Sequence, residues 1–146
     1  MALHEVLLLA AARKAVLEAV VAIDRDMRLL ARSSQACHRL MTIPGVGQLT
    51  ALAFVATIDA PERFRRSRDV GAYLGLVPRH FQSGEIDYVG SISKCGGRRV
   101  RTLLCEAANV MLTRYRGALA LKEWALGIAR HSTMRNARVA LARRLS

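Results

Sequence analysis

The sequence predicts a mainly α-helical protein, in which a long N-terminal helix is followed by a helical domain with a small loop or β-hairpin insertion. Residues 1–40 contain no glycine and no proline. Apolar residues recur at helical spacing through most of the remaining chain, whereas residues 76–92 lose this periodicity. We therefore divide the 146 residues into a coiled-coil or dimerisation helix, 1–40, and a domain that contains a helix-hairpin-helix element, 41–146.

The first segment is predicted to be one helix from about residue 2 to about residue 40. Its apolar seam alternates spacings of four and three residues, as in a coiled coil, with one interruption at Arg13. Homodimerisation is one interpretation, and a helix that packs on its own domain is the other. Arg13 and Lys14 stop the apolar run short of a membrane span, so no membrane partner is expected. The seam consists of Val6, Leu9, Val16, Val20, Ile23, Met27 and Leu30.

Two glycines flank one apolar residue in the sequence Ile43-Pro44-Gly45-Val46-Gly47, which precedes the apolar segment Gln48 to Ile58. Glycine permits a tight turn and a close approach that a β-carbon would prevent. The N–H groups at the start of the next helix, with the helix dipole, favour a phosphate. The pattern predicts a helix-hairpin-helix element in which Gly45, Val46 and Gly47 contact a nucleic-acid backbone. A plain turn between helices is the alternative.

Shorter elements follow. Ser67 is expected to cap a helix that continues to Leu74 and ends at Gly75. Residues 76–92 are interrupted by proline and glycine and alternate Ile86 with Tyr88, which predicts a loop or a small hairpin.

Three helices are predicted after this insertion. The first begins near Arg98, the second covers Ala118 to Ala129 and buries Trp124, and the third is capped by Ser132 or Thr133. Both ends of the chain lie within helical patterns, which suggests a fragment of a longer protein.

The formal net charge is +12 and is concentrated near the C-terminus. Residues 93–146 carry twelve basic and two acidic side chains, whereas residues 41–92 carry five of each. Twenty of the 23 basic residues are arginines, which suit bidentate contacts with phosphate. A GC-rich coding sequence would explain arginine in place of lysine, but not the clustering. A polyanionic partner, DNA or RNA, is therefore expected.

The cysteines and acidic residues show no metal-binding pattern. Cys37, Cys95 and Cys105 lack CxxC spacing and are interpreted as free thiols in a reducing cytoplasm. The acidic residues form no spaced cluster, so neither a cofactor nor a metal-dependent nuclease site is expected within this chain. No signal peptide is recognised. We expect a soluble protein in the cytoplasm.

The irregular segment inside an otherwise helical chain is the expected place for a site. Ser83 precedes Gly84 on a predicted turn, so its hydroxyl would be exposed, with Arg79 and the following basic residues around it. Such a hydroxyl could attack a phosphodiester while arginines stabilise charge on the phosphoryl oxygens. A polar turn before a basic helix is the alternative.

The turn Ser93-Lys94-Cys95-Gly96-Gly97 leads into the basic helix. It is interpreted either as a flexible helix entry or as an anion-binding turn in which backbone N–H groups bind phosphate beside Lys94. We expect Lys94, Arg98, Arg99 and Arg101 to contact nucleic acid.

The order of motifs resembles one known family. Over residues 41–146 it is similar to the serine-bearing C-terminal domain of the insertion-sequence 110/116/902 transposases, which include the Piv-type DNA invertases. The motifs are Ile43 to Gly47, Gly71 to Arg79, Ser83-Gly84, Ile92-Ser93-Lys94 with Gly96 and Arg101, and Ala137 to Leu145 with Arg143 and Arg144.

This resemblance implies recombination of DNA strands at a composite active site across a dimer, guided in several members by a structured bridge RNA. The family's nucleophile, which forms a covalent phosphoserine bond to DNA, matches Ser83, because this serine precedes Gly84 after Gly-Leu-Val-Pro-Arg. Ser93 is the second choice. A RuvC-like domain with four acidic ligands would supply a divalent metal, and the family's coiled coil matches the N-terminal helix.

Two departures from the family pattern affect these expectations. The RuvC-like domain is missing from this chain, so strand cleavage by the chain alone should fail. Lys94-Cys95-Gly96-Gly97 stands where the family commonly has Lys-Arg-Gly-Asn, which alters the contacts at this turn. Two other functions remain open: a non-catalytic helix-hairpin-helix module that binds DNA or RNA, and a coiled-coil assembly unit whose basic end keeps it soluble.

Overall fold

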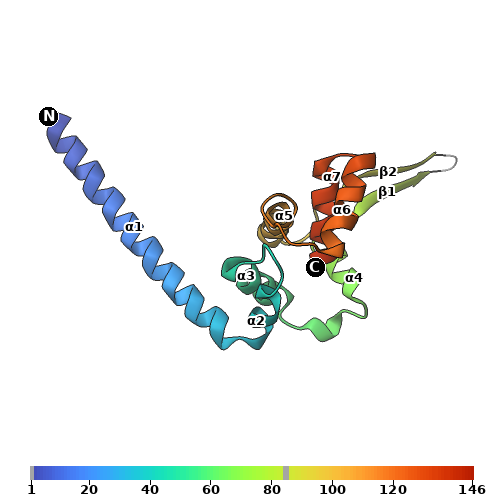
Figure 1. Cartoon of the computed structure of the whole chain (residues 1–146), viewed down its shortest axis with the longest axis horizontal. Coiled ribbons are helices and arrows are strands. Elements are labelled where there is room, and N and C mark those ends of the chain that lie inside the picture. The colour runs from blue at the N-terminus through green and yellow to red at the C-terminus, as the bar shows by residue number, and fades with distance from the viewer. Residues whose placement is uncertain (1, 84–85) are drawn as a thin grey trace.

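The computed structural model describes residues 2–83 and 86–146, with side-chain surroundings for 3–79 and 90–146. The described chain is mainly helical with a small antiparallel hairpin, which confirms the predicted fold class. Figure 1 shows a central body of helices from which α1 (Ala2–Ser33) and the hairpin project in opposite directions. No helix in the described ranges has the length and apolar character needed to cross a membrane.

The N-terminal segment consists of two helices, so the prediction of one helix to about residue 40 is wrong. Helix α1 ends at Ser33, and α2 (Gln35–Met41) begins after Ser34. Ser34 has extended backbone angles (φ −99°, ψ 115°), and its hydroxyl accepts a hydrogen bond from the N–H of Cys37 at 3.3 Å. This N-cap starts a new helix. The seam ends at Leu30, so heptad spacing could not reveal the cap.

The last turns of α1 pack against the body. Ala31 is buried with Cys37 of α2 and Ala51 of α3 (Gln48–Ile58). The side-chain amide of Gln48 donates to Asp24 Oδ1 at 2.7 Å, which ties α3 to α1. The preceding residues of α1, 3–23, are exposed, and Figure 1 shows this part as a rod that extends away from the body.

The main core lies among α3, α5 (Arg98–Thr113), α6 (Ala120–His131) and α7 (Met134–Leu145). Helix α7 packs against both α5 and α6, and α5 also contacts α3. Leu104, Met111 and Leu141 are buried there, because apolar residues at three- and four-residue spacing share one face of each helix. Thr133 caps α7, as predicted, since its hydroxyl accepts from the N–H of Asn136 at 3.2 Å.

A short 3-10 helix, η1 (Pro61–Arg63), and helix α4 (Ser67–Tyr73) connect α3 to the hairpin. The prediction that Ser67 caps α4 is wrong, since this serine is the first residue of the helix. The cap position is Arg66, whose N–H donates to a carboxylate oxygen of Asp69 at 3.2 Å. A carboxylate in the first turn is also favoured by the positive end of the helix dipole.

The predicted insertion is a hairpin of strands β1 (Pro78–Ser83) and β2 (Ile86–Ile92). The strands pair antiparallel, with Pro78 opposite Ile92 at the base and Ser83 opposite Ile86 at the far end. The register shifts between Pro78 and His80, as at a β-bulge, so the strands twist close to their base.

Two turns cross at the base of the hairpin and fix it to the helices. Gly75 and Gly96 have φ values of +69° and +83°. A β-carbon on Gly75 would collide with the backbone of Cys95, and one on Gly96 would collide with the carbonyl oxygen of Tyr73. The N–H of Lys94 donates to the Gly75 carbonyl at 3.1 Å across the same contact. We call this contact the glycine crossing; it requires that both residues lack side chains.

Trp124 is 38% exposed, which corrects the prediction that α6 buries it. Its neighbour Ala125 is fully buried instead. Successive residues of an α-helix are about 100° apart, so the face of α6 that packs on the core is centred near Ala125 and not near Trp124. The guanidinium of Arg144 lies over the indole, 4.5 Å from the ring centroid. Trp124 is therefore held at the surface between α6 and α7.

Candidate nucleic-acid interface

A groove of about 950 Å³ lies where the hairpin base meets α4, α6 and α7. We call it the basic groove. Helix α7 contributes one face to it, because its lining residues recur at 135–136, 139–140 and 143–144. The described lining residues are Ser67, Arg68, Leu76, Pro78, Gly90, Ser91, Ile92, Lys94, Trp124, Arg135, Asn136, Val139, Ala140, Arg143, Arg144 and Ser146.

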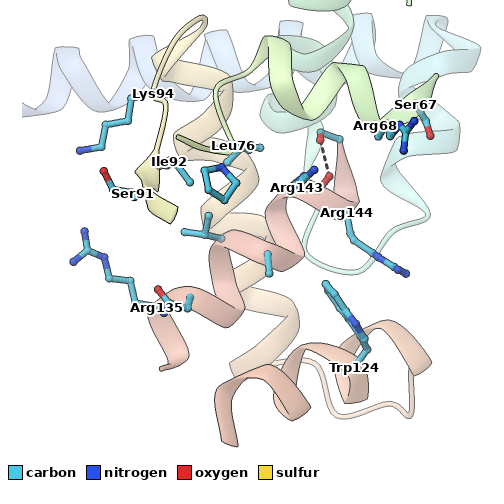
Figure 2. A pocket seen from close by; sticks show the side chains of 16 residues that line it. Ser67, Arg68, Leu76, Ser91, Ile92, Lys94, Trp124, Arg135, Arg143 and Arg144 are labelled. Carbon is cyan, nitrogen blue, oxygen red and sulfur yellow. Dashed lines mark hydrogen bonds between the residues drawn. The ribbon is translucent and has the colours of Figure 1, made fainter. Parts of the chain in front are cut away.

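The charged side chains of the basic groove have one sign. Its described lining contains no Asp or Glu and five exposed cationic side chains: Arg68, Lys94, Arg135, Arg143 and Arg144. Figure 2 shows Lys94 and Arg135 on one side, Arg68 and Arg144 on the other, and Arg143 between them. Clustered cations in a recess create a positive potential that attracts a polyanion.

Ser83, the predicted nucleophile, is the last residue of β1, at the end of the hairpin away from the helical body (Figure 1). Arg79 lies four residues earlier, about 13 Å along an extended strand. Its guanidinium donates to the carbonyl of Ser93 at 2.9 Å, which holds it at the hairpin base. The side chain of Ser83 belongs to the segment whose side chains are not described, and Gly84 lies outside the described residues.

Ser93, the second choice, lies at the hairpin base. It is half-buried, and its N–H donates to the carbonyl of Val77 at 2.8 Å. Lys94 follows with a left-handed backbone (φ +56°), and its exposed side chain lines the basic groove. Backbone contacts thus hold the predicted turn. Ser93 is next in sequence to Lys94, a cation of the basic groove, whereas Ser83 lies at the other end of the hairpin.

The three arginines predicted at the start of α5 differ in their surroundings. Arg101 is half-buried, and its guanidinium donates to the carbonyls of Leu74 and Cys95 at 2.9 and 3.3 Å. It therefore braces the glycine crossing. Arg98 and Arg99 are exposed in the first turn of α5, outside the described lining of the basic groove.

The loop predicted as a phosphate contact packs against its own chain. A β-carbon on Gly45, whose φ is +90°, would collide with the carbonyl oxygen of Ala107 in α5. Val46 is half-buried against the core, whereas a β-carbon on Gly47, the cap of α3, would meet nothing within 4 Å. Ala107 is nine residues after Arg98, which is about 13 Å along a helix. The Gly45 loop, which packs on Ala107, therefore does not lie beside the arginines at the start of α5.

The described His, Cys, Asp and Glu side chains form no group of three or more that could hold a metal ion. The three cysteines are free: Cys37 is buried, Cys105 is half-buried and Cys95 is exposed. Burial raises the pKa of the Cys105 thiol, although nearby Arg138 and Arg101 lower it. Cys105 is therefore held as a neutral thiol.

Comparison with known proteins identifies the family. The sequence pattern described as Transposase IS116/IS110/IS902 family matches residues 37–125, more than half of the chain. The chain belongs to this family. The resemblance drawn from the motif order is thereby confirmed.

Three relatives show how much of a transposase of this family the chain represents. The transposase for insertion sequence element IS1111A from Coxiella burnetii is 36% identical over 126 residues, which are 86% of this chain and 35% of the relative. The transposase for insertion sequence element IS1328 from Yersinia enterocolitica is 35% identical, over 78% of this chain and 35% of the relative. The pilin gene-inverting protein of Moraxella lacunata is 36% identical, over 52% of this chain and 24% of the relative. The chain spans about a third of the length of the two transposases.

Sequence reasoning missed the basic groove as a site. The excess of basic residues in 93–146 and the Arg143-Arg144 pair in the family motif pointed to this region. Which side chains converge, however, depends on how α7 packs and on where α4 brings Arg68. Trp124 was missed because an indole in an amphipathic helix is expected to be buried.

Proposed function

We propose that this chain is the part of a DNA transposase that binds nucleic acid and supplies the Ser83 hydroxyl as the nucleophile for strand cleavage and exchange. The transposases and the pilin gene-inverting protein among its relatives support this role. The observation that carries the proposal is the projecting hairpin. Its base is fixed beside the basic groove, while its far end, with Ser83, extends away from the helical body (Figure 1).

In this proposal the basic groove binds the phosphate backbone of DNA or of a structured guide RNA. Arginines favour such contacts because the guanidinium donates two parallel hydrogen bonds to phosphate oxygens. The exposed pair Arg98 and Arg99 would extend the interface. The start of α3, with Gly47 open to solvent, would add the helix-hairpin-helix contact. The protein would act in the bacterial cytoplasm, on the nucleoid.

Ser83 would complete an active site whose other groups come from elsewhere. Arg79, the strand's own arginine, is held at the hairpin base by Ser93, so charge at a phosphodiester near Ser83 would be stabilised by another domain or chain. The Ser83 oxygen would bond to phosphorus and give up its proton, the bond from phosphorus to the leaving strand would break, and the leaving oxygen would take up one proton, so that the step is neutral in protons. A divalent metal in a RuvC-like domain would offset negative charge on the phosphate. The isolated chain would be inactive.

We also propose that α1 pairs with a second copy of this chain. Along this helix Val16, Val20 and Ile23 are 61%, 55% and 59% exposed, although heptad spacing places them on one seam. A long apolar seam without a cover favours association in water. Such a dimer would bring two hairpins into one assembly.

The test is covalent capture of DNA. The chain is combined with the RuvC-like region of a longer relative, a guide RNA and DNA carrying the element end, and protein–DNA adducts are resolved on a denaturing gel. Ser83→Ala should abolish the adducts and leave binding nearly unchanged, because a methyl group cannot attack phosphorus. Ser93→Ala is the matched control and should retain them.

Adducts that persist in the Ser83→Ala variant would rule out Ser83 as the nucleophile. Loss in the Ser93→Ala variant alone would move the role to the hairpin base.

A second candidate function is non-catalytic binding by a helix-hairpin-helix module. It is favoured by the separation between Ser83 and the cations, which the structure gathers at the hairpin base. In the same assay this function predicts salt-dependent binding without adducts for the unmodified chain.

A further inference from the structure

Trp124 occupies an unusual position for the only tryptophan of the chain. It lines the basic groove and is 38% exposed. Figure 2 shows its ring at the edge of the groove, beside the extended side chain of Arg144. The exposed part of the indole lies in the recess, where a flat group could cover it.

The surroundings of Trp124 specify the chemistry of that ligand. The Arg144 guanidinium lies 4.5 Å from the ring centroid, which fixes the ring by a cation–π contact. Arg68, Arg135 and Arg143 supply further positive charge, and the described lining contains no Asp or Glu. The apolar side chains of the groove, Val139 among them, form a surface that favours a flat, partly apolar group. A ligand with an aromatic plane and regularly spaced negative charge would satisfy both features.

We propose that the basic groove holds a single-stranded nucleic-acid segment with one unpaired base stacked on Trp124. The inference rests on the proposed function and specifies the form of nucleic acid that this site takes. Aromatic side chains next to a cationic groove bind single strands, because each base offers a face for stacking while the phosphates follow the cations. In a duplex both faces of a base are covered by its neighbours, so duplex would contact the arginines without stacking on the indole.

The experiment uses the fluorescence of Trp124, which needs no label in a chain with one tryptophan. The full chain is titrated with oligothymidylate, oligouridylate and a DNA duplex of equal length, and binding is followed independently by anisotropy of end-labelled strands. We expect both single strands to quench the emission to saturation, in parallel with binding. We expect the duplex to bind with little quenching. The single strand that binds with the higher affinity identifies the segment as DNA or RNA.

Substitutions give the size of the effect. Trp124→Ala should weaken single-strand binding about 5- to 140-fold and duplex binding much less, because stacking is lost while the phosphate contacts remain. Trp124→Phe keeps an aromatic face and should restore most of the affinity. Tyr73→Ala is the matched control, since Tyr73 is 43% exposed under Arg63 at 5.0 Å but lies outside the described groove lining. Thermal melting shows that each variant is folded.

The outcomes separate this inference from the proposed function. Strands that bind by anisotropy without quenching, or a Trp124→Ala variant that binds them normally, would overturn the stacking while nucleic-acid binding stood. Absence of any salt-dependent binding would overturn both. Equal losses of single-strand affinity in the Trp124→Ala and Tyr73→Ala variants would also reject the stacking, because the loss would then not be specific to an aromatic residue in the basic groove.

Discussion

Gly75 and Gly96 decide how closely the hairpin base approaches the helices. Each has a positive φ, and each faces the backbone of the opposite turn. A β-carbon at either position meets main-chain atoms, which cannot rotate away as a side chain can. Arg101 adds two hydrogen bonds to carbonyls of the same turns, so a residue predicted to contact phosphate has an internal structural role.

Gly75→Ala should therefore lower the free energy of unfolding by about 3 kcal/mol or more, through backbone strain and collision with the facing turn. Chemical denaturation monitored by circular dichroism measures the change. Gly127→Ala is the control, because a β-carbon at Gly127 would meet nothing within 4 Å and the residue lies inside α6. It should raise stability by about 0.5–1 kcal/mol, since alanine favours a helix over glycine. Equal effects at both sites would contradict the glycine crossing.

Most of helix α1 makes no packing contact with the rest of the chain. Residues 3–23 are exposed, and packing begins near Asp24 and Ala31, where α1 meets α2 and α3. Most helical stability in proteins comes from packing of an apolar face, which residues 3–23 lack within this chain. In the proposed dimer a second copy, which has the same seam, would supply that packing.

Val16→Glu combined with Val20→Glu should keep the chain monomeric, because charges in an apolar seam oppose pairing. Sedimentation equilibrium over a range of concentrations measures the association. Arg25→Glu is the charge-matched control: it also lowers the net charge by two, and its heptad position lies opposite the seam. It should associate like the unmodified chain. An unmodified chain that stays monomeric at every concentration would refute the proposed dimer.

Element positions could largely be predicted from the sequence, because they follow local patterns. The periodicity of α5 and the alternation in β2 correspond to the observed elements. The break at Ser34 was missed, since a serine hydroxyl that caps α2 gives no periodic signal. The exposure of Trp124 was missed for another reason: whether the indole or Ala125 faces the core depends on the angle at which α6 meets α7.

At the scale of the whole molecule, the groove cations and the proposed nucleophile lie at opposite ends of the hairpin. Residues 93–146 hold ten of the twelve net positive charges, and the groove cations Arg135, Arg143 and Arg144 come from this part of the chain. Composition predicted a polyanionic partner on this basis. The sequence also placed Ser83 at a turn, but it put Arg79 beside this serine, whereas strand pairing and the hydrogen bond to Ser93 hold the Arg79 guanidinium at the hairpin base.

Replacing Arg68 and Arg135 by alanine should weaken nucleic-acid binding and reduce its dependence on salt. The slope of log affinity against log salt concentration should fall by up to about 1.8 for duplex DNA, since each lost phosphate contact removes about 0.9. Replacing Arg25 and Arg32, both exposed on α1, changes the net charge equally and should leave the slope unchanged.

The same titration applies to Arg98 and Arg99, whose replacement by alanine should also flatten the slope if α5 belongs to the interface. An unchanged slope for that pair would confine the interface to the basic groove. An unchanged slope for the groove pair would exclude the groove as the electrostatic contact.

The glycine crossing also limits how this protein can change during evolution. What stands in the way of a larger residue at position 75 or 96 is the main chain of the facing turn, which every amino acid shares. A compensating substitution elsewhere cannot clear that space, as trimming a bulky neighbour would in an ordinary core. Trimming a neighbouring side chain therefore does not repair damage at either position, and reversion to glycine is the direct route.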